Sequence, residues 1–167
     1  MSRGFVKEDD QEEIPIVPQR AYLPDGVTNF VTRSGMNQLL EEKEALISER
    51  DNLNISDENE KRIALNFINA KLNLLINRIS SAKIVDNSDQ PANEIRFGAI
   101  VTLRTETSKE TQTFQIVGVD EADISKGKIS FISPLAKILI NKRKGDKAVL
   151  KRTGENVVFE ILGIDYQ

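Results

Sequence analysis

The sequence contains no cysteine, no histidine and no tryptophan. Without cysteine there is no disulfide, no thiol nucleophile and no cysteine-ligated zinc, a usage that fits a reducing compartment. Without histidine the chain lacks the commonest general base and the commonest metal ligand. Any chemistry therefore depends on carboxylates, amines and hydroxyls, or on the active site of a partner.

Aromatic residues make up only 5 % of the 167 residues, which argues against a deep aromatic ligand pocket. Charged residues reach 29 %, with a net charge of −3 and a pI near 5.2. These values are typical of a mildly acidic soluble protein and not of a general nucleic-acid binder. No apolar run approaches the length of a membrane span, and the N-terminus lacks the apolar core of a signal peptide, so we expect a cytoplasmic protein without membrane contact.

Residues 1–30 are predicted to form an extension. Three prolines in "IPIVPQRAYLPDG" exclude a regular helix and favour extended or polyproline geometry. One interpretation is a flexible tail, and the alternative is that its apolar residues dock on the rest of the molecule or on a partner. The apolar residues are Ile14, Ile16, Val17 and Tyr22, and an acidic run precedes them at Glu8, Asp9, Asp10, Glu12 and Glu13.

Residues 31–86 show helical periodicity in two arms separated by "NISDENE". Thr32 or Ser34 is suited to cap the first arm. Each arm has an apolar seam with charges on its other faces, so we predict that the two fold back as an antiparallel coiled-coil hairpin. The alternative is that the second seam pairs between chains in an adaptor. The seams comprise Met36, Leu39, Leu40, Leu46, Ile47 and Leu53, then Leu65, Ile68, Leu72, Leu75, Ile79 and Ala82.

Residues 87–95 have the composition of a linker, and residues 96–167 then alternate with period two. Five segments are predicted as strands: Ala99–Arg104, "TQTFQIVGVD", "GKISFI", "KAVL" and "NVVFEILGIDY". A single short helix is predicted from Pro134 to about Asn141, with Ser133 as its N-cap and cations after it. The predicted fold class is therefore α+β, a helical hairpin followed by a small antiparallel sheet with one helix.

The segment "FQIVGVDEADISKGKISFISPLAKILINKRKGD", residues 114–146, resembles the carboxy-terminal domain of the bacterial Gre transcript-cleavage factors. The matching features are an aromatic-x-Ile-Val-Gly-x-x-Glu-Ala-Asp stretch, Ile-Ser-x-x-Ser-Pro-Leu-Ala, and Lys-x-Gly-Asp. "FEILGIDY", "FGAIVTL", "SAKIVD" and "VTRSGMNQLLEEKEAL" extend the similarity to about residues 28–167.

The resemblance implies an FKBP-like domain that docks at the secondary channel of RNA polymerase while the coiled coil enters the channel. It implies an elongation factor that is not itself an enzyme: it has no cofactor or metal of its own, and acidic tip residues assist a Mg²⁺ in the polymerase active site. We expect a monomer that meets nucleic acid only indirectly or through a basic patch. The implied docking residues are Asp120, Glu121, Ser133, Pro134, Leu135, Ala136 and Lys137.

The hairpin tip departs from the family's cleavage motif, Gly-Asp, two residues, Glu-Asn-Ala, one residue, Tyr. "NISDENEKR" keeps Glu58-Asn59 but has Ile55 in place of the Asp and Arg62 in place of the Tyr. The first arm, about 20 residues or roughly 30 Å, is about three turns shorter than expected for a cleavage-competent coil. The candidate tip acids are Asp57, Glu58 and Glu60, for which helix capping is the alternative role.

Two further functions are considered. One is prolyl isomerase activity, which needs an aromatic pocket; the available aromatics are Phe97, Phe114, Phe131, Phe159 and Tyr166. The other is contact with an anionic surface through a basic patch, with binding that weakens in salt. The patch comprises Lys137, Lys142, Arg143, Lys144, Lys147, Lys151 and Arg152.

Overall fold

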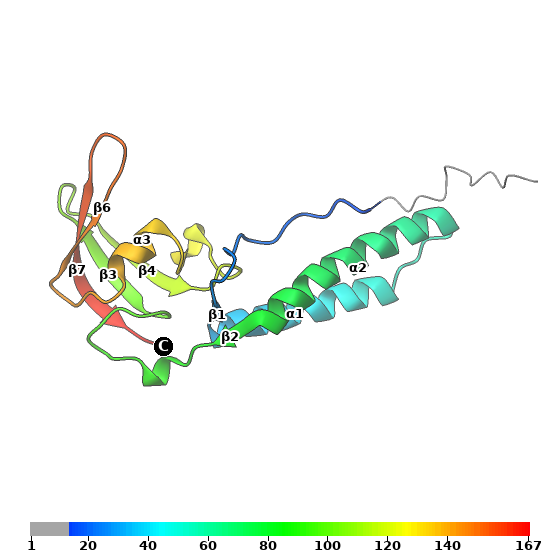
Figure 1. Cartoon of the computed structure of the whole chain (residues 1–167), viewed down its shortest axis with the longest axis horizontal. Coiled ribbons are helices and arrows are strands. Elements are labelled where there is room, and N and C mark those ends of the chain that lie inside the picture. Colours follow the sequence, from blue (N-terminus) through cyan, green and yellow to red (C-terminus); the bar gives the residue numbers. More distant parts are fainter. Residues whose placement is uncertain (1–13) are drawn as a thin grey trace, which may run out of the picture.

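The computed structural model describes residues 14–167, and the acidic run predicted at residues 8–13 lies outside that range. A long helical hairpin projects from a small sheet domain, and an extended N-terminal segment runs beside the hairpin (Figure 1). This arrangement confirms the predicted α+β class.

The hairpin consists of α1 (Arg33–Asp51) and α2 (Glu58–Ser81), which pack against each other (Figure 1). Thr32 caps α1 by accepting a hydrogen bond from Gly35 N, and Asp57 caps α2 by accepting one from Glu60 N. The predicted seams meet inside one chain, which places the second seam against α1. Leu40 is an exception, because its side chain is 42 % exposed. The buried seam residues are Leu39, Leu46, Ile68, Leu72 and Leu75.

A two-stranded parallel sheet closes the base of the hairpin, and the sequence pattern did not predict it. β1 (Asn29–Val31) precedes α1 and β2 (Ala82–Ile84) follows α2, with Asn29 paired to Ala82. Asn29 and Phe30 were assigned to the extension, and Ala82 to the helical seam. Helix α2 instead ends at Ser81, where the chain becomes extended and Val85 N donates to Val31 O at 3.0 Å.

The sheet domain contains five strands in the order β5-β4-β3-β7-β6. The sheet is mixed and not wholly antiparallel as predicted, because β4 and β5 pair in parallel. The turn and short 3-10 helix η3 (Ile124–Lys126) between them bring the chain back alongside the second half of β4, where Lys128 pairs with Gln115. The strands are β3 (Ile100–Thr105), β4 (Thr111–Val117), β5 (Lys128–Ser130), β6 (Lys147–Leu150) and β7 (Val157–Asp165).

Helix α3 (Pro134–Leu139) packs on this sheet through the fully buried Ala136 and Leu139. It ends two residues before the predicted boundary, because Asn141 adopts a left-handed backbone with φ of 69°. The cations at 142–144 therefore lie in the turn leading to β6. A second 3-10 helix, η2 (Asn87–Asp89), occupies the linker. In the described residues no helix has the length and apolar character needed to span a bilayer.

Candidate functional site

The residues singled out in the sequence fall into three places. The tip is the loop between α1 and α2 together with the first turn of α2. The α3 face comprises residues 133–137, the N-cap and the first residues of α3. The junction is the region where the hairpin base, the sheet domain and the strap, which we define as residues 14–27, come together (Figure 1).

The tip acids are exposed and belong to the first turn of α2. Asp57 Oδ1 accepts from Glu60 N at 2.8 Å, which confirms its capping role. Glu58 forms no ion pair within residues 14–167. Across the same residues, no three acidic side chains gather closely enough to hold a metal ion. The tip therefore presents exposed negative charge.

The α3 face contains fewer accessible side chains than the sequence implied. Pro134 and Lys137 are exposed, and Ser133 caps the helix by accepting from Ala136 N at 3.2 Å. Ala136 is fully buried and Leu135 packs against the core. Of the predicted docking set on this helix, Pro134 and Lys137 thus form its accessible part.

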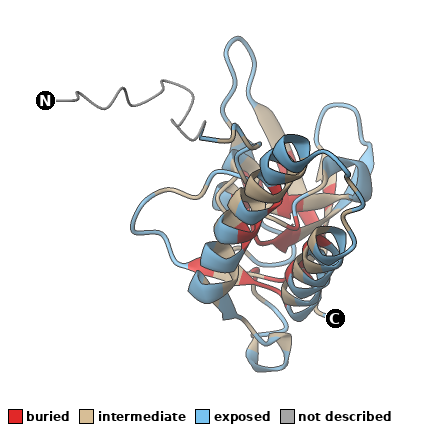
Figure 2. Cartoon of the chain, turned by 90° about the vertical axis from the view of Figure 1, so that its right-hand side faces the viewer, coloured by how far each residue is buried: buried red, intermediate tan, exposed pale blue. Residues whose placement is uncertain are grey.

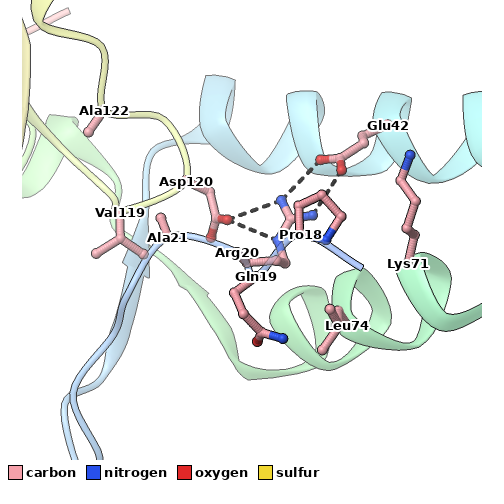
Figure 3. A pocket seen from close by; sticks show the side chains of 10 residues that line it. All are labelled: Pro18, Gln19, Arg20, Ala21, Glu42, Lys71, Leu74, Val119, Asp120 and Ala122. Atoms are coloured by element: carbon pink, nitrogen blue, oxygen red, sulfur yellow. Dashed lines mark hydrogen bonds and ion pairs between the residues drawn. The ribbon is translucent and has the colours of Figure 1, made fainter. Parts of the chain in front are cut away.

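Asp120 faces the junction instead of an open surface. Its side chain is 9 % exposed and lies between two arginines from different segments, Arg20, drawn in Figure 3, and Arg78. Arg20 Nε donates to Asp120 Oδ1 at 3.0 Å, and Arg78 Nε lies 3.3 Å from Oδ2. Charge within this turn is therefore neutralised by contacts internal to the chain.

Arg20 continues the same network to the hairpin. Its two terminal nitrogens donate to the two Glu42 carboxylate oxygens at 2.8 and 3.0 Å (Figure 3). These hydrogen bonds raise the pKa of the Arg20 guanidinium against the effect of burial, and the Asp120 charge raises it further. The strap thus connects α1 to the sheet domain through one side chain.

Glu121 is also engaged at the junction. Thr32 Oγ1 donates to Glu121 Oε2 at 2.5 Å, and Lys128 Nζ lies 3.3 Å from Oε1. A Cβ on Gly35 would stand 2.6 Å from Oε2, so glycine is what allows the carboxylate to approach the first turn of α1. The sequence indicated the cap at Thr32 but not its second bond to a residue 89 positions away.

An aromatic cluster and a close backbone approach complete the junction. Phe30 of β1 meets Phe97 and Phe131 of the sheet domain, with ring centroids 5.6–5.9 Å apart. A Cβ on Gly118 would lie 2.6 Å from Phe30 O, so glycine permits that approach as well. All five aromatics considered for an isomerase pocket pack in or against the core of the sheet domain. Packing accounts for those positions.

The strap borders a groove of about 360 Å³ between the two helices and the turn that follows β4 (Figure 3). Arg78 Nη2 donates to Ala21 O at 2.6 Å and holds the strap to α2. Docking through apolar side chains, the alternative to a flexible tail, is not seen for Ile14, Ile16 and Tyr22, which are 77–94 % exposed, whereas Val17 is half-buried. The hydrogen bonds and ion pairs that attach the strap are made at residues 20–21.

Comparison with known proteins shows which protein family this chain is similar to. A family model described as "Transcription elongation factor, GreA/GreB, C-term" matches residues 90–166. Transcription elongation factor GreA of Rhodospirillum rubrum is 36 % identical over 120 residues, which cover 70 % of this chain and 76 % of that protein. The GreA of Acidiphilium cryptum is 42 % identical over 60 % of this chain and 64 % of its own length.

Several curated relatives are thus matched over slightly less than two thirds of their length. Among solved structures, a prokaryotic GreA/GreB elongation factor from Nitrosomonas europaea aligns with 82 % of this chain and 98 % of its own. Its sequence identity is 19 % and its TM-score is 0.42.

Proposed function

The chain belongs to the GreA/GreB family of transcription elongation factors, and from this premise we propose that it binds RNA polymerase at the secondary channel and regulates elongation. The proposal assigns docking to the exposed part of the α3 face and a reach into the channel to the hairpin. The observation that carries it is a projecting two-helix rod that ends in solvent-exposed acids (Figure 1).

The dimensions of the rod support this division of labour. Helix α1 has 19 residues and α2 has 24, which correspond to about 28 and 36 Å at about 1.5 Å per residue. Figure 2, which views the molecule along the hairpin, shows exposed residues around the outside of both helices and buried ones between them. A free-standing rod of this kind, with its buried seam between the two helices, suits insertion into a channel.

In this proposal the chain supplies carboxylates and the polymerase supplies the chemistry. A Mg²⁺ held in the polymerase active site would polarise the phosphodiester and activate water. Within this chain, Asp57 Oδ1 is committed to capping α2. The side chains of Glu58 and Glu60 form no hydrogen bond or ion pair in the described residues, and Glu58, which belongs to the Glu-Asn pair shared with the family motif, is the better candidate to face that metal.

The test measures RNA cleavage in backtracked elongation complexes. Glu58→Gln removes the charge at nearly constant shape, and Asp57→Asn removes charge while keeping a capping oxygen. Glu49→Gln, an exposed acid on α1, is the matched control. If the tip assists cleavage, Glu58→Gln abolishes the stimulation and Glu49→Gln does not. If the wild type binds polymerase and does not stimulate cleavage, the hairpin acts by occupying the channel.

Docking is tested separately by direct binding to RNA polymerase. Lys137→Glu on the α3 face should weaken binding, whereas Lys151→Glu in the turn between β6 and β7 serves as the same charge change elsewhere in the domain. Equal weakening by both would point to general attraction through the basic patch, with strong salt dependence. Unchanged binding in both would remove the α3 face from the proposal.

A further inference from the structure

We propose that the strap fixes the direction in which the hairpin points relative to the α3 face, and that Arg20 is the positioning residue. The strap lies outside the part of the chain matched by the family model, which begins at residue 90. The strap contacts both the hairpin and the sheet domain, the two parts whose relative orientation the proposal concerns.

Arg20 touches two structural parts at once. It pairs with Glu42 on α1 and with Asp120 on the turn after β4. Arg78 of α2 reinforces the arrangement by contacting Asp120 and the strap carbonyl of Ala21. Two cations and two anions from the strap, both helices and the sheet domain therefore form one network, of which Figure 3 shows Arg20, Glu42 and Asp120.

The network is partly withdrawn from water, and its geometry fits an arginine at position 20 better than a lysine. The side chains of Arg20, Arg78 and Asp120 are 18 %, 13 % and 9 % exposed, whereas that of Glu42 is 44 % exposed. The planar guanidinium of Arg20 pairs with both oxygens of Glu42, a geometry that an ammonium group cannot reproduce. Without Arg20, Glu42 would lose its partner and Asp120 would keep only one.

The location of the network explains why it acts on direction. The covalent connection from β2 to the sheet domain runs through residues 85–99, whose only regular element is η2. The hairpin projects from this base, so a small rotation is amplified along its length. A rotation of about 10° would displace a tip about 28 Å away by about 5 Å, which exceeds the reach of a carboxylate contact.

The value of a fixed direction for transcription rests on the proposed function, but the fixing itself is a property of the free protein. Since the chain contains no cysteine, Asn54→Cys at the tip and Glu155→Cys in the sheet domain can be labelled with nitroxides without other changes. Pulsed electron spin resonance then gives the distribution of distances between tip and domain.

The full chain with Arg20 intact should give one narrow distribution. Arg20→Ala should broaden it or shift it, and Arg20→Lys should give an intermediate width because charge remains and the paired hydrogen bonds are lost. Arg33→Ala is the matched control: it removes an arginine that is 74 % exposed and pairs with Asp86, itself 54 % exposed, at the hairpin base, and it should leave the distribution unchanged. Circular dichroism confirms that each variant keeps its helices.

An unchanged distribution in folded Arg20→Ala would overturn the proposal, as would equal broadening in Arg33→Ala. Polymerase binding by the same proteins separates the two ideas. A wild type that fails to bind polymerase while Arg20→Ala still broadens the distribution would refute the proposed function and leave the positioning role intact. A binding wild type with an unchanged Arg20→Ala distribution would refute the positioning role alone.

Discussion

Carboxylates occur at both ends of the hairpin, but their surroundings are opposite. At the junction, Asp120 and Glu121 are almost buried and each is paired with basic side chains from other segments. At the tip, Asp57 and Glu58 face solvent, and their only described role is to favour the start of α2. The same residue type thus serves structure at one end and is available for function at the other.

The difference has an energetic basis. A charge removed from water is tolerated only when it is paired, and deleting its partner leaves an uncompensated cost. An exposed acid keeps its hydration, so its loss changes little. We therefore expect substitutions at the junction to lower the stability most and substitutions at the tip to affect mainly a partner, and the following substitutions test this difference.

The largest loss is expected for Asp120→Ala. This change removes the anion between Arg20 and Arg78, and breaking a largely buried pair costs about 3 kcal/mol. Unfolding in urea, followed by circular dichroism, measures the free energy of unfolding. Asp120→Asn should lose less because an amide oxygen still accepts a hydrogen bond. A loss below that of the tip variants would contradict the contrast.

A smaller loss of unfolding free energy, about 2 kcal/mol, is expected for Gly35→Ala. The added methyl group would displace the buried Glu121 carboxylate from the hydroxyl of Thr32 and leave it without that hydrogen bond. In an ordinary helix position the same change would be stabilising, but here the new Cβ would stand 2.6 Å from Glu121 Oε2. The control is the double variant Gly35→Ala/Glu121→Ala. Its loss should fall short of the sum of the two single losses; full additivity would mean that the glycine and the carboxylate do not oppose each other.

At the tip, Asp57→Ala should cost about 1 kcal/mol through loss of the helix cap. Asp57→Ser restores a capping oxygen without charge and should recover most of that loss. The comparison uses the same urea unfolding measurement. Equal stability of the Ala and Ser variants would show that the cap does not contribute in the full chain.

The smallest effect on folding is expected for Glu58→Gln. The side chain is exposed, and only its favourable position at the N-terminus of α2 is lost, which is worth about 0.3–1 kcal/mol at low salt. Repeating the unfolding at high salt should reduce this difference further. A loss comparable to that of Asp120→Ala would place Glu58 among the structural acids.

How far the sequence predicted these regions depends on the range of the interactions. The hairpin was predictable because seam spacing and the Thr32 and Asp57 caps act within a few residues. Leu40 was misassigned because heptad spacing alone does not tell which flank of a short seam is covered. The parallel pairing of β5 depends on the path of the turn before it, which the alternation of side chains does not encode.

The junction could not be predicted by such rules. Arg20 and Asp120 are separated by 100 positions, and nothing in the composition of the strap indicates a partner on another element. The apolar pattern suggested docking through Ile14, Ile16, Val17 and Tyr22, whereas the hydrogen bonds and ion pairs of the strap are made by Arg20 and the carbonyl of Ala21. Gly35 and Gly118 offered the nearest signal, since each permits a contact that any side chain would obstruct.

The parallel pair formed by β1 and β2 has a consequence for how the rod varies in length. Because the strand before α1 and the strand after α2 are bound to each other, both ends of the hairpin are held at its base whatever lies beyond. Seven residues added to each helix in register would lengthen the rod by about 10 Å without moving that base. The reach of the molecule is therefore adjustable by whole heptads, independently of the surface from which it extends.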